Sequence, residues 1–96
     1  MLKVITFALT LVATPLTAET EDNCVSIGEL AHAIMGARQS GVDLGRAMRL
    51  AGGNELVEAI VLMAYNEPRF SSDQYRQRAA TDFANTWMLA CYEQSN

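Results

Sequence analysis

The stretch AYNEPRFSSDQYRQRA, residues Ala64–Ala79, decides the fold, because one helix must end and another must begin within it. Pro68 prevents a preceding helix from continuing and biases Glu67 toward extended geometry. The following Ser-Ser-Asp-Gln matches a capping box, in which Ser71 and Gln74 satisfy the first free amides of a new helix. The stretch therefore predicts a corner between two helices.

The helix after this corner is expected to run to about Glu93. Apolar residues recur along it at steps of three and four, which is the period of one helix face. The expected core stripe consists of Tyr75, Ala79, Phe83, Trp87 and Ala90.

The helix before the corner is expected over residues 55–66, with Asn54 as its N-cap. Its sequence VEAIVLMA is apolar nearly all round, which is typical of a helix buried on both sides. A strand over residues 60–65 is the alternative, but the chain offers no second strand to pair with it.

Two more helices are expected upstream. The first covers residues 26–40, with Ser26 and Glu29 as a capping box and Gly41 as a left-handed C-cap. A short second helix follows Asp43 as its N-cap and ends at Gly52-Gly53. The chain is therefore predicted to form an all-α, compact four-helix domain.

The N-terminus has the layout of a secretory signal peptide. Lys3 precedes an apolar run over residues 4–13, and a small residue, Ala18, ends the segment. The run is about half the length that spans a bilayer, so no stable membrane anchor is expected after cleavage. We predict a signal peptide over residues 1–18 and one domain over residues 19–96; the alternative is an N-terminal core helix.

The predicted mature chain is acidic. It contains six arginines and eleven acids, a net charge of −5. Binding to nucleic acid needs clustered cations, so no nucleic-acid partner is expected, and docking on anionic lipid is disfavoured for the same reason.

The two cysteines, Cys24 and Cys91, predict a disulfide between the N- and C-terminal parts of the domain. An exported chain meets oxidising conditions, and a small domain has a marginal core that a bridge stabilises. The bridge requires the start of the first helix to lie beside the end of the last, as in antiparallel neighbours. A catalytic thiol pair is disfavoured, because no C-x-x-C spacing is present.

Taken together, Arg38-Gln39-x-Gly41, Ala64-Tyr65-x-x-Pro68, Phe83 and Cys91 form a pattern that spans most of the predicted domain. The pattern resembles a group of small exported helical proteins of proteobacteria and their phages. No activity is assigned to that group, so the resemblance implies the fold and export to the periplasm or the outside, and no catalytic residue.

The candidate binding residues are Arg38, Tyr65, Glu67 and Arg69. Arg38 lies near the core face of the first helix, where an arginine needs carboxylate or carbonyl partners or reaches water. One interpretation is a structural clamp on the corner, through Glu67 or a carbonyl group. The other is a contact with an anion beside Tyr65 and Arg69.

A second candidate surface, for a protein partner, consists of Met88, Leu89 and Tyr92, which lie off the expected core stripe. Either the short second helix or the third helix covers them, or they form an exposed apolar patch. His32 is the only histidine and is expected on a solvated flank of the first helix together with Gln39. We expect no metal site, cofactor or catalytic residue, because no set of ligands or of acid and base groups converges.

These observations favour a small exported, non-enzymatic protein that binds or modulates another envelope or extracellular protein. The alternative is a periplasmic chaperone of the acid- or stress-activated type, which exposes apolar surface when its carboxylates are protonated. Eleven acids and a hydrophobic content of 50% are compatible with that alternative. A small hydrolase or redox enzyme is the least favoured class.

Overall fold

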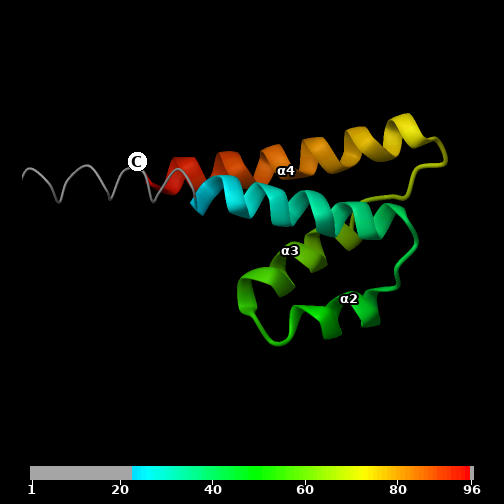
Figure 1. Cartoon of the computed structure of the whole chain (residues 1–96), viewed down its shortest axis with the longest axis horizontal. Coiled ribbons are helices and arrows are strands. Elements are labelled where there is room, and N and C mark those ends of the chain that lie inside the picture. The colour runs from blue at the N-terminus through cyan, green and yellow to red at the C-terminus, as the bar shows by residue number, and fades with distance from the viewer. Residues whose placement is uncertain (1–22, 96) are drawn as a thin grey trace, which may run out of the picture.

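The computed structural model describes residues 23–95, and these contain four helices and no strand. Residues 23–39 belong to the N-terminal helix, which is followed by α2 (Leu44–Ala51), α3 (Glu55–Tyr65) and α4 (Asp73–Ser95), as Figure 1 shows. The all-α fold is confirmed, and the alternative of a strand over residues 60–65 is wrong because these residues lie in α3. The predicted signal peptide lies outside the described residues.

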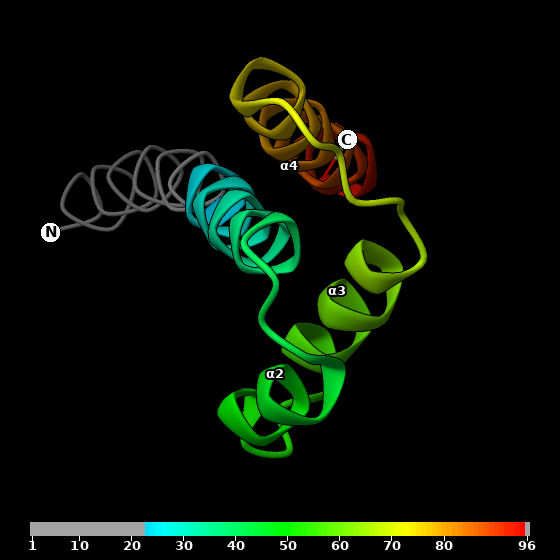
Figure 2. The ribbon, with the colours of Figure 1, turned by 90° about the vertical axis from the view of Figure 1, so that its right-hand side faces the viewer.

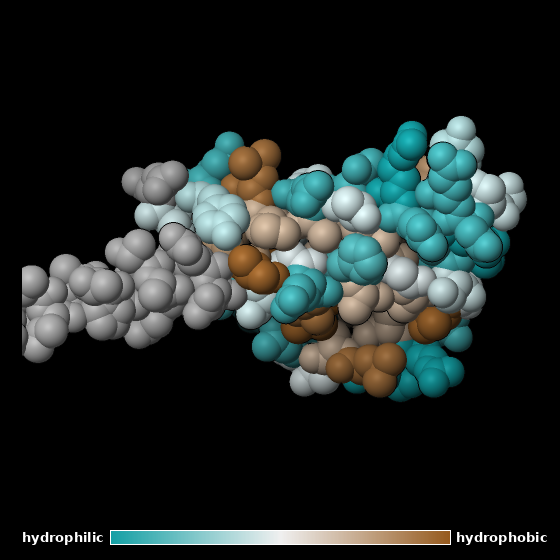
Figure 3. All heavy atoms as spheres, turned by 45° about the horizontal axis from the view of Figure 1, so that its top comes forward, coloured by the Kyte–Doolittle hydropathy of each residue, from teal (hydrophilic) through white to brown (hydrophobic). Residues whose placement is uncertain are grey.

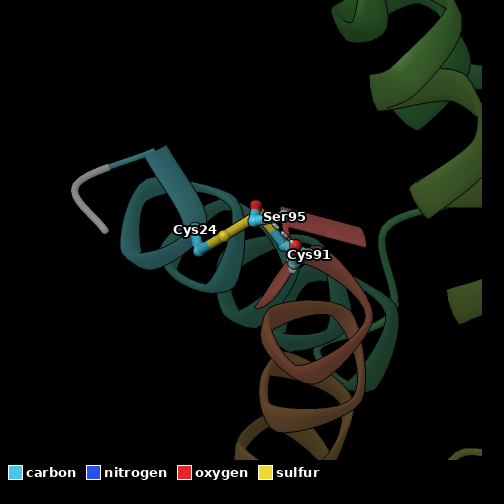
Figure 4. The surroundings of a disulfide bond; sticks show 3 residues. All are labelled: Cys24, Cys91 and Ser95. Atoms are coloured by element: carbon cyan, nitrogen blue, oxygen red, sulfur yellow. Dashed lines mark hydrogen bonds between the residues drawn. A yellow bond between two sulfur atoms is a disulfide. The ribbon is translucent and has the colours of Figure 1, made fainter. Parts of the chain in front are cut away.

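The N-terminal helix and α4 run antiparallel and side by side, and α2 and α3 pack below this pair (Figures 1 and 2). This arrangement brings Cys24 and Cys91 together, with 5.5 Å between their Cα atoms, and they form the expected disulfide (Figure 4). Beside the bridge, the Ser95 hydroxyl donates to the carbonyl oxygen of Cys91 at 3.0 Å. The bridge closes a loop of 67 residues, which stabilises the fold by about 4 kcal/mol in the chain-entropy model.

Three helix ends have the caps that the sequence predicts. After the N-terminal helix, Gly41 adopts φ = 93°, and the amide of Val42 donates to the carbonyl of Ala37 at 3.1 Å, which is a Schellman motif. The Asp43 carboxylate accepts from the third amide of α2 at 2.8 Å. The Asn54 side chain does the same for α3 at 3.0 Å. These caps fix where α2 begins and where α3 begins.

Two predicted helix starts are wrong. Residues 23–25 are already helical, so Ser26 lies inside the N-terminal helix and Cys24 is part of it rather than before it. At α4 the cap is Ser72 and not Ser71, since the Ser72 hydroxyl accepts from the Tyr75 amide at 3.2 Å. At α4 two adjacent serines made the cap position ambiguous by one residue, which is within the usual uncertainty of a helix end.

The core lies between the N-terminal helix, α3 and α4. Its buried members are Ala31, Met35, Ile60, Ala64, Ala80 and Phe83. Leu30, Ile34, Tyr65, Ala79 and Trp87 pack against them. The expected α4 stripe is therefore correct at Ala79, Phe83 and Trp87. It is wrong at both ends, because Tyr75 and Ala90 are exposed.

The N-terminal helix and α4 approach closely near the disulfide. Gly28 is buried there, and a Cβ atom at this position would collide with the end of the Met88 side chain. Small residues on α4, Ala80 and Ala84, are buried along the same helix. The buried face of α4 thus follows small residues that a hydropathy pattern underweights.

The third helix, α3, is not buried on both sides as the sequence predicted. Ile60, Val61 and Ala64 are buried, whereas Leu62 and Met63 are each 49% exposed. Figure 2 shows the reason, since α3 has the other helices on one side only. Its apolar sequence therefore leaves hydrophobic side chains at the surface.

Candidate functional site

The corner between α3 and α4 is held by the last turn of the N-terminal helix. The guanidinium of Arg38 donates to the carbonyl oxygen of Glu67 from Nε at 3.2 Å and from Nη2 at 3.1 Å. The same guanidinium lies 5.1 Å from the centre of the Tyr65 ring, within the range of a cation–π contact. Arg38 is therefore the structural clamp that one of the two interpretations predicted.

Gln39 is the centre of the corner, and the expectation that it lies on a solvated flank is wrong. Its side chain is 2% exposed. Its amide nitrogen donates to the carbonyl oxygen of Pro68 at 2.8 Å, and its amide oxygen accepts from the backbone N–H of Phe70 at 2.9 Å. One side chain thus satisfies a donor and an acceptor of a loop that has no secondary structure to pair with.

The signal for Gln39 was present in the sequence. It lies four residues after the buried Met35, so it continues the buried face of the N-terminal helix beyond the last apolar residue. A polar residue in that position needs hydrogen-bond partners inside the fold, and a proline-containing loop supplies free backbone groups.

Arg69 also faces the N-terminal helix. Its Nη2 donates to the carbonyl oxygen of Gln39 at 3.4 Å, and a Cβ atom on Gly41 would lie 3.2 Å from the same nitrogen. A cation near the last carbonyl groups of a helix interacts favourably with the helix dipole. The Arg69 guanidinium thus lies against the end of the N-terminal helix, although Arg69 is exposed overall.

Tyr65 connects the corner to the start of α2. Its hydroxyl donates to the carbonyl oxygen of Val42 at 2.6 Å. Burial raises the pKa of this hydroxyl above its usual value of 10.0, and the nearby Asp43 adds to the rise, while Arg38 opposes it. The neutral phenol is therefore the form that fits this contact.

The structure thus brings together all four candidate binding residues, but it uses three of their side chains internally. Glu67 differs, since its carbonyl oxygen accepts from Arg38 while its side chain lines a surface hollow. The prediction of an anion contact at Arg38, Tyr65 and Arg69 stays a prediction, and their geometry gives them a structural task.

The hollow beside Glu67 lies between α3 and α4 and is called the aromatic hollow below. It has a volume of about 270 Å³ and is lined by Met63, Glu67, Phe70, Tyr75, Arg78, Ala79, Asp82, Phe83 and Thr86. The rings of Phe70 and Tyr75 are 6.2 Å apart, and the guanidinium of Arg78 lies 5.8 Å from the centre of the Tyr75 ring. Sequence reasoning missed this hollow, because it placed Tyr75 in the core.

The members of the aromatic hollow are unusually open for their type. Tyr75 is 54% exposed, Met63 49% and Phe70 37%. Phe83 closes the hollow from the core side, since it is buried. Among residues 23–95 the carboxylates of Glu67 and Asp82 form no ion pair within this hollow or elsewhere.

The second candidate surface is partly covered. Met88 is half-buried over Gly28, so the N-terminal helix covers it rather than α2 or α3. Tyr92 is also half-buried, while Leu89 is 58% exposed. Leu89 is the member of this set that is open to a partner.

Within residues 23–95, no three His, Cys, Asp or Glu side chains come close enough to hold a metal ion, and His32 is exposed. In the same part of the chain, no helix is both long and apolar enough to cross a membrane.

Comparisons of the chain with family models, with curated proteins and with solved structures found no match. The resemblance to small exported helical proteins therefore stays an expectation, and the function must be argued from the geometry.

Proposed function

We propose that the protein is a small exported, non-enzymatic protein that binds or modulates another envelope or extracellular protein through the aromatic hollow. The observation that carries this proposal is the gathering of Phe70, Tyr75, Met63 and Arg78 around one surface depression. Aromatic residues, methionine and arginine are the types enriched at the centres of protein interfaces.

The disulfide bond supports the proposal that the protein is exported. The Cys24–Cys91 disulfide indicates folding in an oxidising, non-cytoplasmic compartment. The periplasm or the extracellular medium is the location we propose, with removal of residues 1–18. The intact mass of protein recovered from the periplasm or the medium is expected to begin at Glu19, and a full-length cytoplasmic product would contradict export.

The charges around the hollow indicate what kind of partner surface binds there. The carboxylates of Glu67 and Asp82 form no ion pair within the described chain, and Arg78 already lies over one face of Tyr75. A partner with an apolar or aromatic anchor for the hollow and basic residues around it satisfies both features. We propose a partner of this kind.

The test compares two matched exposed residues on the two candidate surfaces. The mature, oxidised domain and its Tyr75→Ala and Leu89→Ala variants are used to capture partners from envelope extracts, followed by binding measurements on the protein recovered. Loss of one interface hot spot costs about 2 kcal/mol or more, so Tyr75→Ala is expected to weaken binding at least about thirtyfold. Leu89→Ala is expected to leave the affinity unchanged.

Each outcome of this comparison decides between surfaces. If Leu89→Ala weakens binding and Tyr75→Ala does not, the partner binds the surface of Met88, Leu89 and Tyr92, and the aromatic hollow is the wrong site. Unfolding curves of both variants serve as controls, because both side chains are exposed and their removal should leave stability nearly unchanged.

A chaperone of the acid-activated type is the second proposal. Exposed leucines on α2, α3 and α4 favour it, with Leu50, Leu62 and Leu89 the most exposed. Acid activation requires that protonated carboxylates release internal contacts. The contacts that hold the corner consist of arginine, amide and carbonyl groups instead, so the first proposal has the stronger support.

A further inference from the structure

A second depression lies on another side of α3, and it differs in chemistry from the aromatic hollow. It is called the apolar groove below and runs between the N-terminal helix, α2 and α3, with a volume of about 350 Å³. Eleven residues line it, and ten of them are apolar. In Figure 3, hydrophobic residues, coloured brown and tan, gather along the lower part of the face in view.

Several of the side chains that line the groove are small. Ala33 and Ala37 of the N-terminal helix and Ala47 and Ala51 of α2 are among them, together with Val61 of α3. Alanine side chains are short, so they leave the space between the helix backbones unfilled. Because α2 is capped at both ends, the groove is largely formed before any ligand enters.

One charged residue lines the groove. Arg46 lies in the first turn of α2, one turn before Leu50, which is 76% exposed. Within residues 23–95 the Arg46 guanidinium forms no ion pair, although its backbone amide is capped by Asp43. An unpaired cation at an apolar groove, in a chain whose net charge is negative, gives the groove a polarity opposite to that of the whole protein.

From this arrangement we infer that the apolar groove binds a single-chain amphiphile with a carboxylate head group. The hydrocarbon chain lies along the alanine-lined walls, and the carboxylate pairs with Arg46 through charge-assisted hydrogen bonds. The inference goes beyond the proposed function, since it concerns another surface and a small ligand.

The size of the groove favours a small ligand over a protein segment. Its volume lies at the lower end of the range for small-molecule pockets, about 300–1,000 Å³. A stable protein interface buries about 800 Å² on each partner, and a groove lined by only eleven residues on short stretches of three helices offers less apolar surface than that. A carboxylate amphiphile also uses the unpaired cation, which a purely apolar segment does not.

The probe is decanoate, titrated below its critical micelle concentration into the oxidised mature domain and followed by calorimetry. We expect saturable 1:1 binding, and affinity that rises about fourfold for each added methylene until the chain exceeds the groove. Decanol and decyltrimethylammonium, which lack the carboxylate, are expected to bind at least about tenfold more weakly.

Matched variants locate the site. Arg46→Met keeps the apolar part of the side chain and removes the charge, so decanoate should bind about tenfold more weakly while decanol is unaffected. Arg49→Met is the control, because Arg49 is on the same helix but does not line the groove. Ala33→Phe should fill the groove and abolish binding, whereas Ala59→Phe, on an exposed position of α3 outside the groove, should not.

Several results would overturn the inference. These are the absence of saturable decanoate binding, equal affinity for decanoate and decanol, and binding that Ala33→Phe leaves intact. Association with anionic lipid vesicles in place of free decanoate would point to a membrane surface instead. A concentration-dependent dimer that Ala33→Phe disrupts would show that a second copy of the chain occupies the groove. None of these results bears on the partner that the aromatic hollow is proposed to bind.

Discussion

Gln39→Ala tests whether the corner depends on one buried side chain. The substitution removes the partners of the Pro68 carbonyl and of the Phe70 amide, which now lie at 2.8 and 2.9 Å from the Gln39 amide group. Each backbone group that loses its partner costs about 1–3 kcal/mol, with the lower figure applying where water can replace the partner. Both loop residues are exposed, so water reaches part of the site. We therefore expect a loss of about 2–4 kcal/mol.

This loss is large for a domain whose free energy of unfolding is about 5–15 kcal/mol. Urea unfolding of the oxidised mature domain measures it, with Gln74→Ala as the control. Gln74 is an exposed glutamine in the first turn of α4, so its replacement should change the free energy by less than about 0.5 kcal/mol. If the two variants unfold at the same urea concentration, Gln39 does not hold the corner.

Gln39→Glu adds a pH-dependent test of the same contacts. The introduced carboxylate can still accept from Phe70, but it cannot donate to Pro68 and it places a charge in a side chain that is 2% exposed. Protonation restores the donor, so the folded state should raise the pKa of this carboxyl above its unfolded value of about 4.3. The stability of the variant should then be highest below that value and fall as the pH rises through the folded pKa. A variant that is equally stable at all pH values would contradict this reasoning.

Four further predictions follow from the same contacts. Phe83→Ala should lower the free energy of unfolding by about 3–5 kcal/mol, because Phe83 is in the core. Arg69→Ala should lower it by less than about 1 kcal/mol, because the one hydrogen bond of Arg69 is long at 3.4 Å. Equal shifts in thermal unfolding would show that Arg69 is as structural as Phe83. Cys91→Ala should cost about 2–5 kcal/mol, and non-reducing peptide mapping of the unmodified protein should recover Cys24 and Cys91 as one linked pair. Tyr65→Phe should lower the free energy of unfolding by about 1 kcal/mol at neutral pH. The folded state raises the pKa of Tyr65, so the stabilising contact is intact below pH 10.0 and is lost as the pH rises further. The unmodified protein should therefore lose more stability at alkaline pH than the variant does. The one ion pair among residues 23–95, Arg76–Asp73, is exposed. Lowering the pH to about 3, below the usual carboxyl pKa values, should therefore not increase the binding of a hydrophobic dye. An increase would favour the chaperone alternative.

The features that the sequence predicted correctly are those with local causes. Asp43 and Asn54 cap helices because each side chain reaches an amide three residues away. Gly41 ends the N-terminal helix because the backbone there has a positive φ that favours glycine. The disulfide was predicted from two cysteines in a chain expected to be exported, so no detailed packing was needed.

The features that the sequence did not predict depend on which helices meet. The expected stripe of α4 and its observed core-facing side share Ala79, Phe83 and Trp87. They differ in whether Tyr75 or Ala80 turns inward. Alanine has little hydrophobic weight in a sequence pattern, yet it is what a close helix crossing requires. The exposed position of Tyr75, and with it the aromatic hollow, follows from this choice.

The same limit applies to the corner. Arg38, Tyr65 and Arg69 are polar or amphipathic, and a sequence shows that such residues lie together without showing which way they face. Their partners are main-chain carbonyl oxygens of Glu67, Val42 and Gln39, which no residue pattern encodes. The sequence therefore offered a clamp by Arg38 as one of two interpretations, and choosing between them needed the fold.

The corner and the aromatic hollow are linked through Phe70. Its backbone N–H is held by Gln39 at 2.9 Å, and its carbonyl oxygen accepts from Nε of Arg76 at 2.7 Å, so both of its main-chain groups are fixed. A residue whose main chain is already fixed loses less conformational entropy when a partner binds, and this preorganisation contributes to affinity. Because Gln39 does not line the hollow, Gln39→Ala changes binding only indirectly, through the position and mobility of the loop that carries Phe70. Under conditions where the Gln39→Ala variant is still folded, weaker binding to a partner of the hollow would therefore show that the buried contacts of the corner serve the surface outside it.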